Sequence, residues 1–487
     1  MSGTTSHSSL ITSRAYIDGQ WCEAASGRTF EVTNPASGAV ITQVPDMDAE
    51  DTRRAIAAAH AAQPAWAALT AKERSNKLYA WFAAITAHSD ELARIMTCEQ
   101  GKPLAEAKGE VAYGASFIQW FAEEGKRAYG RTIPGFSGDR RLATIKQPVG
   151  VVAAITPWNF PIAMITRKAG PALAAGCTIV IKPAAETPLC ALALAVLAEQ
   201  AGIPAGVINI VTSHQASTVG NELCSNPVVR KLSFTGSTRI GKLLMRQCAD
   251  TMKKLSLELG GNAPFIVFDD ADLDAAVAGA LASKYRNAGQ TCVCANRILV
   301  QASVYDAFAE KLTAAVKAFK VGDGMAEGTQ IGPLINPAAA SKVAELVQQS
   351  VAAGAEVLLG GEAHPAGPLF YQPTILGKVD KTNPILQEEI FGPVAPLVRF
   401  ETEAEAIAIA NDTPYGLAAY FYGRDIARVW RVAEQLEYGM VGINEGIIST
   451  ELAPFGGIKE SGLGREGAAE GLEEYLETKY LCFGAIR

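Results

Sequence analysis

The run Val151-Val152-Ala153-Ala154-Ile155-Thr156 is followed by a helical stretch and then by a second apolar run, Thr178-Ile179-Val180-Ile181. Three more runs rich in β-branched or other apolar residues follow at residues 207–211, 231–234 and 254–257, with helix-like segments between them. Strands that are apolar along their whole length are covered on both faces, and crossover helices keep successive strands parallel. The sequence therefore predicts an α/β fold whose first domain is a doubly wound parallel sheet.

The chain continues with a second series of strand-like runs and begins with a helical layer. The second series occupies residues 265–268, 298–301, 356–359, 394–400, 418–422 and 440–443. It predicts a second α/β domain, with a boundary close to Gly260-Gly261. Upstream, residues 48–127 are Ala-rich with apolar positions at helical spacing and predict covering helices, whereas residues 142–145 alternate as in one strand of a projecting hairpin.

Composition limits the classes of function. A chain of 487 residues that is 49% hydrophobic is too long for one core, and its net charge of −7 argues against nucleic acid or an anionic membrane as the main partner. No run approaches the ~20 apolar residues of a membrane span. Met1 to Ser9 has no secretory-signal pattern and predicts a frayed tail, and nine scattered cysteines favour a reducing, cytoplasmic compartment.

Two loops carry candidate chemistry. Gly289-Gln290-Thr291-Cys292 lies between a helical segment and a strand, where a cysteine can be exposed and activated as a thiolate; the alternative is an incidental cysteine. Gly236-Ser237-Thr238-Arg239-Ile240-Gly241 joins a strand to a helix, which suits phosphate binding by helix N-terminal N–H groups or simply a turn. The five histidines form no metal-binding pair, and the spacing of Cys292 and Cys294 is not that of a zinc site, so we expect no metal.

Seven motifs in order resemble the aldehyde dehydrogenase superfamily, over about residues 16–480. They are Thr156-Pro157-Trp158-Asn159-Phe160-Pro161, Lys182-Pro183-Ala184-Ala185-Glu186-Thr187-Pro188, Phe234-Thr235-Gly236-Ser237-Thr238, Leu257-Glu258-Leu259-Gly260-Gly261, Gly289-Gln290-Thr291-Cys292, Glu388-Glu389-Ile390-Phe391-Gly392-Pro393 and Pro454-Phe455-Gly456-Gly457. The resemblance implies that family's fold: a Rossmann-like cofactor domain (1–130 and 150–260), a catalytic domain (261–469) and a small β oligomerisation arm (131–149 and 470–487). It also implies a homodimer or homotetramer, without deciding between them.

The resemblance assigns catalytic roles that the chemistry also requires. Cys292 is implied as the nucleophile that forms a thiohemiacetal and then a thioester. Asn159 and the backbone N–H of Cys292 resemble the family's oxyanion hole, and Glu258 its general base, which favours water as acceptor and a free acid as product. Lys168 and Glu466 match positions proposed as a proton relay in relatives, although a solvated lysine and a surface glutamate fit the sequence as well.

Cofactor roles follow from the same resemblance. Lys182 is implied at the adenosine ribose, and Gly236 and Ser237 at the pyrophosphate. Trp158 and Leu259 are implied beside the nicotinamide, and Glu389 with Phe391 at its ribose. NAD-preferring relatives often carry Glu where this chain has Ala185, so Ala185 favours NADP or the use of both cofactors, with the orientation of Glu186 left open.

Two arginines suggest the substrate class. Arg167 and Arg286, together with Ser449, resemble the substrate-carboxylate site of succinate-semialdehyde dehydrogenases, and a guanidinium pairs well with a carboxylate. Succinate and glutarate semialdehyde remain alternatives because one methylene discriminates weakly. Cys294 could form a regulatory disulfide with Cys292 or be an inert thiol. A broad or non-acidic aldehyde dehydrogenase, and a cysteine hydrolase without cofactor, stay as alternatives; the hydrolase lacks a histidine in any motif.

Overall fold

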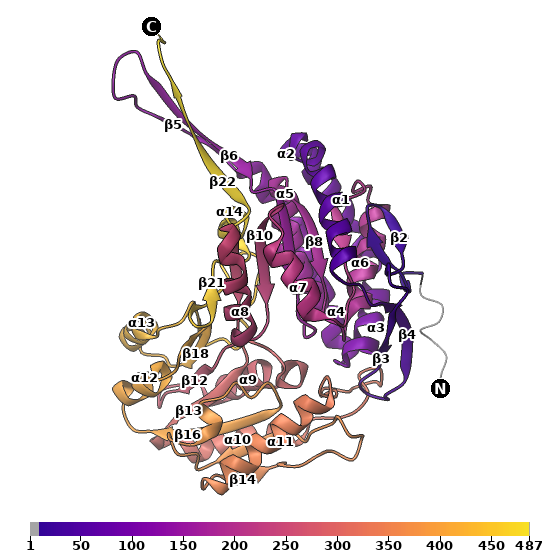
Figure 1. Ribbon diagram of the computed structural model, residues 1–487. Helices are drawn as coiled ribbons and strands as arrows, with labels where there is room; N and C mark the ends of the chain where they lie inside the picture. The colour runs from indigo at the N-terminus through magenta and orange to yellow at the C-terminus, as the bar shows by residue number, and fades with distance from the viewer. Residues whose placement is uncertain (1–8, 487) are drawn as a thin grey trace.

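The computed structural model describes residues 9–486, so nearly all of the expected N-terminal tail lies outside the described residues. Two sheets dominate the chain (Figure 1). The centre of the first contains five parallel strands, as predicted: β9 (Ile208–Ile210), β8 (Thr178–Lys182), β7 (Val151–Ile155), β10 (Val229–Thr235) and β11 (Lys254–Glu258). Antiparallel strands close its two edges: β1 (Ala15–Ile17) and β2 (Gln20–Cys22) at one, β21 (Gly462–Leu463) at the other.

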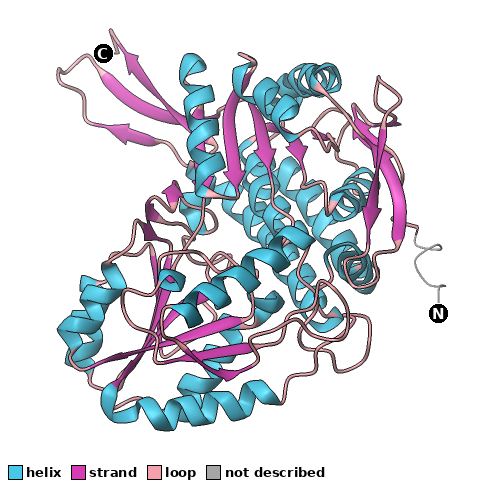
Figure 2. Ribbon diagram, turned by 60° about the horizontal axis from the view of Figure 1, so that its bottom comes forward, coloured by secondary structure: helices cyan, strands magenta, loops and turns pink. Residues whose placement is uncertain are grey.

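The second sheet is mostly parallel and lies between helices (Figure 2). Its order is β14 (Glu356–Leu359), β15 (Thr374–Gly377), β16 (Val394–Phe400), β13 (Ala295–Gln301), β12 (Ala263–Val267), β18 (Ala418–Tyr422) and β19 (Met440–Ile443). Two features differ from the expectation: β15 was not predicted, and β14 pairs with it antiparallel. β14 is partly exposed, in keeping with an edge strand.

Helices cover both sheets. The predicted N-terminal layer consists of α1 (Ala49–Ala68), α2 (Ala71–Ala87), α3 (Ser89–Gln100) and α4 (Leu104–Glu124), and capping boxes at Asp48 and Thr70 begin the first two. The crossover helices of the first sheet are α5 (Pro161–Ala175), α6 (Pro188–Gln200), α7 (Ala216–Ser225) and α8 (Thr238–Cys248). The helices that connect the strands of the second sheet are α9 (Leu273–Lys284), α10 (Tyr305–Lys317), α11 (Pro337–Ala352), α12 (Glu403–Asn411) and α13 (Ile426–Gln435). In the described part, none of the helices combines the length and apolarity that a membrane span requires.

Two buried carboxylates on helices of the N-terminal layer cap the N-termini of two crossover helices. Glu110 on α4 accepts hydrogen bonds from the backbone N–H groups of Ile162 and Ala163, in the first turn of α5. Glu99 on α3 accepts from Leu189 and Cys190 at the start of α6, and burial raises the pKa of Glu99 to about 8. A carboxylate at a helix N-terminus satisfies free N–H groups and is favoured by the helix dipole. These contacts fix α5 and α6 against the outer helices.

A three-stranded arm projects from the body and carries the C-terminal end of the chain (Figure 1). β22 (Leu476–Phe483) pairs along its length with β6 (Arg141–Pro148), which also pairs with β5 (Arg131–Ile133). The predicted hairpin is therefore confirmed. Two further two-stranded sheets join β3 (Thr29–Thr33) to β4 (Val40–Pro45) and β17 (Tyr415–Gly416) to β20 (Ile458–Lys459).

The chain passes from the first sheet to the second between β11 and β12, at the expected Gly260-Gly261 boundary. It later returns, because β21 pairs with β11 and α14 (Ala468–Glu473) contacts α4 and α5. We therefore propose that the second domain ends before β21 rather than at residue 469, and that the arm begins at β22 rather than at residue 470.

Candidate active site

The loop that presents Cys292 has an unusual backbone. Three consecutive residues, Asn287, Ala288 and Gly289, have positive φ angles of 52°, 54° and 76°. Gly289 is required there, since a Cβ would lie 2.1 Å from the carbonyl oxygen of Gly392. Asn287 is held by the Glu106 carboxylate, which accepts from its backbone N–H at 2.7 Å, and by Gln100, which donates to its Oδ1 at 3.0 Å. The outer helical layer thus stabilises a backbone that would otherwise be costly.

A cavity of about 280 Å³ lies in front of this loop. Its walls come from the ends of β10 and β11, from the loop before α5 and from the segment before β16. Eight residues singled out from the sequence line it: Trp158, Asn159, Gly236, Ser237, Leu259, Cys292, Glu389 and Phe391. The structure therefore brings the expected nucleophile and most of the expected cofactor residues to one place.

Cys292 is partly buried at this cavity, and burial raises the pKa of its thiol to about 12. The guanidinium groups of Arg167 and Arg286 lower this pKa, whereas the carboxylates of Glu389 and Glu258 raise it. The sequence allowed an exposed, activated thiolate or an incidental cysteine; the structure shows a half-buried Cys292 that lines the cavity.

Asn159 is fixed from two sides. Its side-chain Nδ2 donates to the carbonyl of Gln290 at 3.0 Å, and its own carbonyl accepts from Lys102 Nζ at 2.7 Å and from Asn287 Nδ2 at 3.1 Å. Lys102 is buried and forms an ion pair of 2.5 Å with Glu110. The Asn159 carboxamide is thereby held at the cavity wall next to the Cys292 loop, where a donor to a developing oxyanion is needed.

Glu258 ends β11 and is buried beside a second carboxylate. Burial and the neighbouring charge of Glu466 raise the pKa of Glu258 well above its usual range, against the opposing effect of Arg167 and Lys168. Glu466 forms ion pairs with Lys168 and, at 2.9 Å, with the Nε of Arg167. Although burial acts in the opposite direction, these two cations hold the pKa of Glu466 below its usual range. The alternatives of a solvated Lys168 and a surface Glu466 are therefore excluded.

Arg167, Arg286 and Ser449 all influence the phenol of Tyr113. Burial raises the pKa of Tyr113, and the two guanidinium groups and the Ser449 hydroxyl lower it. The guanidinium of Arg167 stacks 3.9 Å from the ring of Phe455, and that of Arg286 lies 5.1 Å from the ring of Phe160. Both cations also act on Cys292. Two guanidinium groups, each packed on an aromatic ring, therefore influence the thiol.

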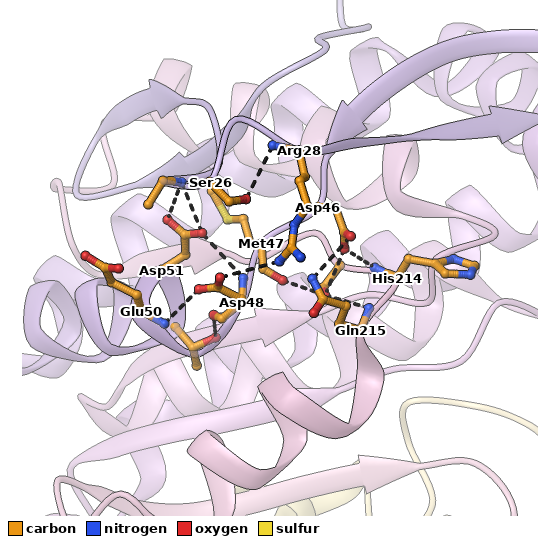
Figure 3. Close-up of polar contacts among 12 residues, drawn as sticks. Ser26, Arg28, Asp46, Met47, Asp48, Glu50, Asp51, His214 and Gln215 are labelled. Atoms are coloured by element: carbon orange, nitrogen blue, oxygen red, sulfur yellow. Dashed lines mark hydrogen bonds and ion pairs between the residues drawn. The ribbon is translucent and has the colours of Figure 1, made fainter.

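The expected adenosine end lies at the ends of β8 and β9. Burial lowers the pKa of Lys182, and the carboxylates of Glu186 and Asp46 oppose that shift, so both lie near its ammonium group. Asp46 is held by hydrogen bonds from the backbone N–H of His214 and from Gln215 Nε2, as Figure 3 shows. Ala185 is half-buried and adds no carboxylate of its own. Glu186 and Asp46 therefore supply negative charge near the position that Ala185 leaves neutral.

At the expected nicotinamide end of the cofactor site, Trp158 and Phe391 pack edge to face with their ring centres 5.6 Å apart. Glu389 accepts a hydrogen bond from the backbone N–H of Gly261 at 3.1 Å, and burial raises its pKa to about 7. Ser237 caps α8 by accepting from the N–H of Ile240. These positions fit a nicotinamide cofactor: an apolar slot between Trp158, Leu259 and Phe391 suits a flat ring, and a helix N-terminus suits a pyrophosphate.

A sequence profile of the aldehyde dehydrogenase family matches residues 21–481. The chain belongs to this family. Among relatives of this aldehyde dehydrogenase, glutarate-semialdehyde dehydrogenase of Pseudomonas aeruginosa is 64% identical over 98% of this chain and 99% of its own. The NADP(+) succinate-semialdehyde dehydrogenase of Escherichia coli is also 64% identical, with the same coverage. A crystal structure of succinate-semialdehyde dehydrogenase from Burkholderia pseudomallei superimposes with a TM-score of 0.98 at 59% identity, covering 99% of this chain and 100% of that one.

Sequence reasoning missed several residues of this aldehyde dehydrogenase site. Tyr113, Lys102 and Glu110 lie on or next to a helix of the outer layer, which the sequence presented only as a cover. The one available signal was the position of charged groups on the apolar face of that helix. Cys294 is buried behind the loop, with its Sγ 3.3 Å from the carbonyl oxygen of Lys284, and both Cys292 and Cys294 are free thiols. A disulfide between them stays a prediction.

Proposed function

We propose that the protein oxidises succinate semialdehyde, or its homologue glutarate semialdehyde, to the dicarboxylic acid with NADP or NAD. The observation that carries this proposal is the pair of guanidinium groups, Arg167 and Arg286, beside the Cys292 thiol. A guanidinium favours an anionic ligand, and a carboxylate matches its fork. Arg286 is half-buried, whereas Arg167 is buried and already pairs with Glu466 through its Nε. The relatives named above point to the same substrates. No metal is needed for this chemistry.

The chain's own residues divide the reaction between them. Cys292 Sγ bonds to the aldehyde carbon, and Asn159 donates to the oxygen that gains negative charge. When bound, a nicotinamide cofactor accepts the hydride. Glu258 then takes a proton from the water that attacks the thioester, which releases the acid and returns the thiol. Arg167, Arg286 and Ser449 hold the remote carboxylate, so the aldehyde carbon is directed at Cys292.

Replacing Arg286 by alanine tests the substrate class. A hydrogen bond to a charged group contributes about 1.5–3 kcal/mol, so kcat/KM for succinate and glutarate semialdehyde should fall roughly 10- to 100-fold. An uncharged aldehyde of matched length should lose little, because it makes no contact with this guanidinium. Steady-state rates with the three aldehydes measure both effects. If the parent enzyme prefers the uncharged aldehyde, or the variant slows all three equally, the carboxylate site is not where we place it.

Replacing Ala185 by glutamate tests the cofactor. We infer that the protein uses NADP or both cofactors, because Ala185 offers no carboxylate to the ribose 2′-hydroxyl and none to repel a 2′-phosphate, while Glu186 and Asp46 keep negative charge nearby. The Glu variant should bind NADP at least about tenfold more weakly and NAD no worse. Fluorescence titration with each cofactor measures this, and Ala185→Gln is the matched uncharged control. Equal losses in both variants would indicate crowding instead of charge repulsion.

We further propose that the arm mediates a homo-oligomer. Its outer strands β5 and β22 leave free edges, and it exposes apolar side chains, among them Phe136, Tyr480 and Phe483. Free edges with exposed aromatic groups favour pairing with another chain. The nine free cysteines are in keeping with a reducing, cytoplasmic compartment.

A further inference from the structure

The segment that carries Glu389 lies outside every helix and strand. It occupies residues 387–393, between the 3₁₀ helix η5 (Pro384–Leu386) and the start of β16. Within it, Phe391 has a φ of 55°, in the left-handed region that residues other than glycine rarely adopt. Backbone groups without a helix or sheet partner need other hydrogen bonds when they are buried. The conformation of this segment therefore depends on contacts from other parts of the chain.

Asn296 supplies such contacts on both sides of Glu389. Its Nδ2 donates to the Glu388 carbonyl at 2.8 Å, and its Oδ1 accepts from the Ile390 backbone N–H at 3.0 Å. Nδ2 also donates to the Oδ1 of Asn262 at 2.7 Å. Asn296 is 3% exposed and Asn262 is 1% exposed, so these hydrogen bonds are shielded from water. One carboxamide thus holds the backbone from which the Glu389 side chain extends.

The segment around Asn262 contacts both Glu389 and the nucleophile. Asn262 Nδ2 donates to the carbonyl of Leu386 at 2.8 Å. The preceding residue, Gly261, donates its N–H to the Glu389 carboxylate at 3.1 Å. A Cβ at Gly261 would lie 2.5 Å from the carbonyl oxygen of Cys292. Gly261 therefore packs against the main chain of the nucleophile and binds the Glu389 carboxylate.

The two asparagines have equivalent positions in the chain. Asn262 lies four residues after Glu258, the proposed base, and directly precedes β12. Asn296 lies four residues after Cys292, the proposed nucleophile, and belongs to β13. β12 and β13 are paired, parallel neighbours in the second sheet. The hydrogen-bonded asparagines consequently join the segments of the base and the nucleophile to the segment that carries Glu389.

Hydride transfer depends on the distance between two groups that different segments hold. The aldehyde carbon is bonded to Cys292, and the hydride acceptor belongs to a cofactor whose ribose is expected at Glu389. A misplacement of about 1 Å can cost about 10²-fold in rate. We propose that Asn262 and Asn296 are positioning residues that fix Glu389 relative to the thiol. This inference rests on the proposed function and adds to it the residues that set the geometry of hydride transfer.

Replacing Asn296 by alanine tests the proposal. The first hydride transfer, followed by stopped-flow absorbance, should slow about 10- to 100-fold, because the Glu388 carbonyl and the Ile390 N–H lose their partner and the segment moves. Fluorescence titration should show NADP and NAD binding about tenfold more weakly, the loss expected for one hydrogen bond to a charged group. Asn262→Ala should act in the same direction. Asn209→Ala is the matched control, since Asn209 is also buried and bonds two main-chain groups, but in the first sheet.

Two further measurements separate positioning from general damage to the site. The activated ester p-nitrophenyl acetate acylates a reactive cysteine without a cofactor, so Asn296→Ala should hydrolyse it within about twofold of the parent rate. Glu389→Gln removes the carboxylate and keeps the backbone. In that background, Asn296→Ala should slow hydride transfer by less than about twofold more, because both changes act through one group. Thermal melting checks that each variant is folded.

A merely structural role for the asparagines predicts different results. Parent-like hydride transfer or cofactor affinity in folded Asn296→Ala, an equal loss of ester hydrolysis, or a full additional loss in the Glu389→Gln background would overturn the proposal. The oxidation measurements are made with a semialdehyde and with an uncharged aldehyde of matched length. A parent enzyme that oxidises only the uncharged aldehyde contradicts the proposed substrate, and its hydride transfer still tests the two asparagines.

Discussion

Replacing Glu258 by glutamine is expected to slow turnover about 10²- to 10⁴-fold while leaving the first hydride transfer intact. Glu258 lies at the end of β11, near Cys292, and is only 3% exposed. Glutamine keeps the shape of the glutamate side chain but cannot accept the proton. The thioester should therefore form and then persist. Stopped-flow absorbance should show a burst of about one reduced cofactor per active site followed by a nearly flat phase, and mass spectrometry should detect acylated Cys292.

The pH dependence of thioester hydrolysis provides a second readout of Glu258. A general base acts in its ionised form, and burial with the nearby charge of Glu466 raises the pKa of Glu258 well above that of an ordinary carboxyl. Hydrolysis in the parent should accordingly fall as the pH falls through this raised value, and the glutamine variant should lack this limb. A glutamine variant without a burst would assign Glu258 to an earlier step, and a parent rate independent of pH would remove it as the base.

The central strands of both sheets were predictable because each is a continuous run of apolar residues between helical segments. β7 and β8 were predicted to within a residue at one end each. β15 (Thr374–Gly377) was not predicted because its short apolar run follows Pro373 and ends at Gly377, two residues typical of turns. The antiparallel direction of β14 also could not be read, since an edge strand and a parallel strand share the same local sequence. Strand order depends on contacts between distant segments.

In the site, too, residues within local motifs were predictable, whereas contacts between distant segments were not. Cys292, Asn159 and Glu258 were identified because each lies in a motif, and the structure places all three around one cavity or just behind it. Burial was not readable from the sequence: the pKa of the Cys292 thiol is raised because the fold buries it, and the segments around it lie far apart in the chain. For the same reason Arg167 was predicted to bind substrate, whereas its ion pair with Glu466, 299 residues away in the chain, was not.

Replacing Asn159 by alanine is expected to slow hydride transfer itself, by about 10²- to 10³-fold, because it removes a donor to the oxyanion. The carboxamide is preorganised: Gln290 accepts from Nδ2, and Lys102 and Asn287 hold the Asn159 carbonyl. A donor already in place costs no reorganisation as charge develops. The stopped-flow burst should therefore become slow, in contrast to the Glu258→Gln variant, in which the burst stays fast and only the later phase is lost.

The two variants thus act as controls for each other. Asn159→Asp keeps the size of the side chain but replaces the donor by an acceptor, so it should lose at least as much as alanine if the N–H group is what matters. A burst of normal rate in Asn159→Ala would place the oxyanion elsewhere along the cavity wall. A slow burst in alanine that aspartate restores would mean that Asn159 acts by filling space, since aspartate offers the developing charge no hydrogen bond and adds a negative charge beside it.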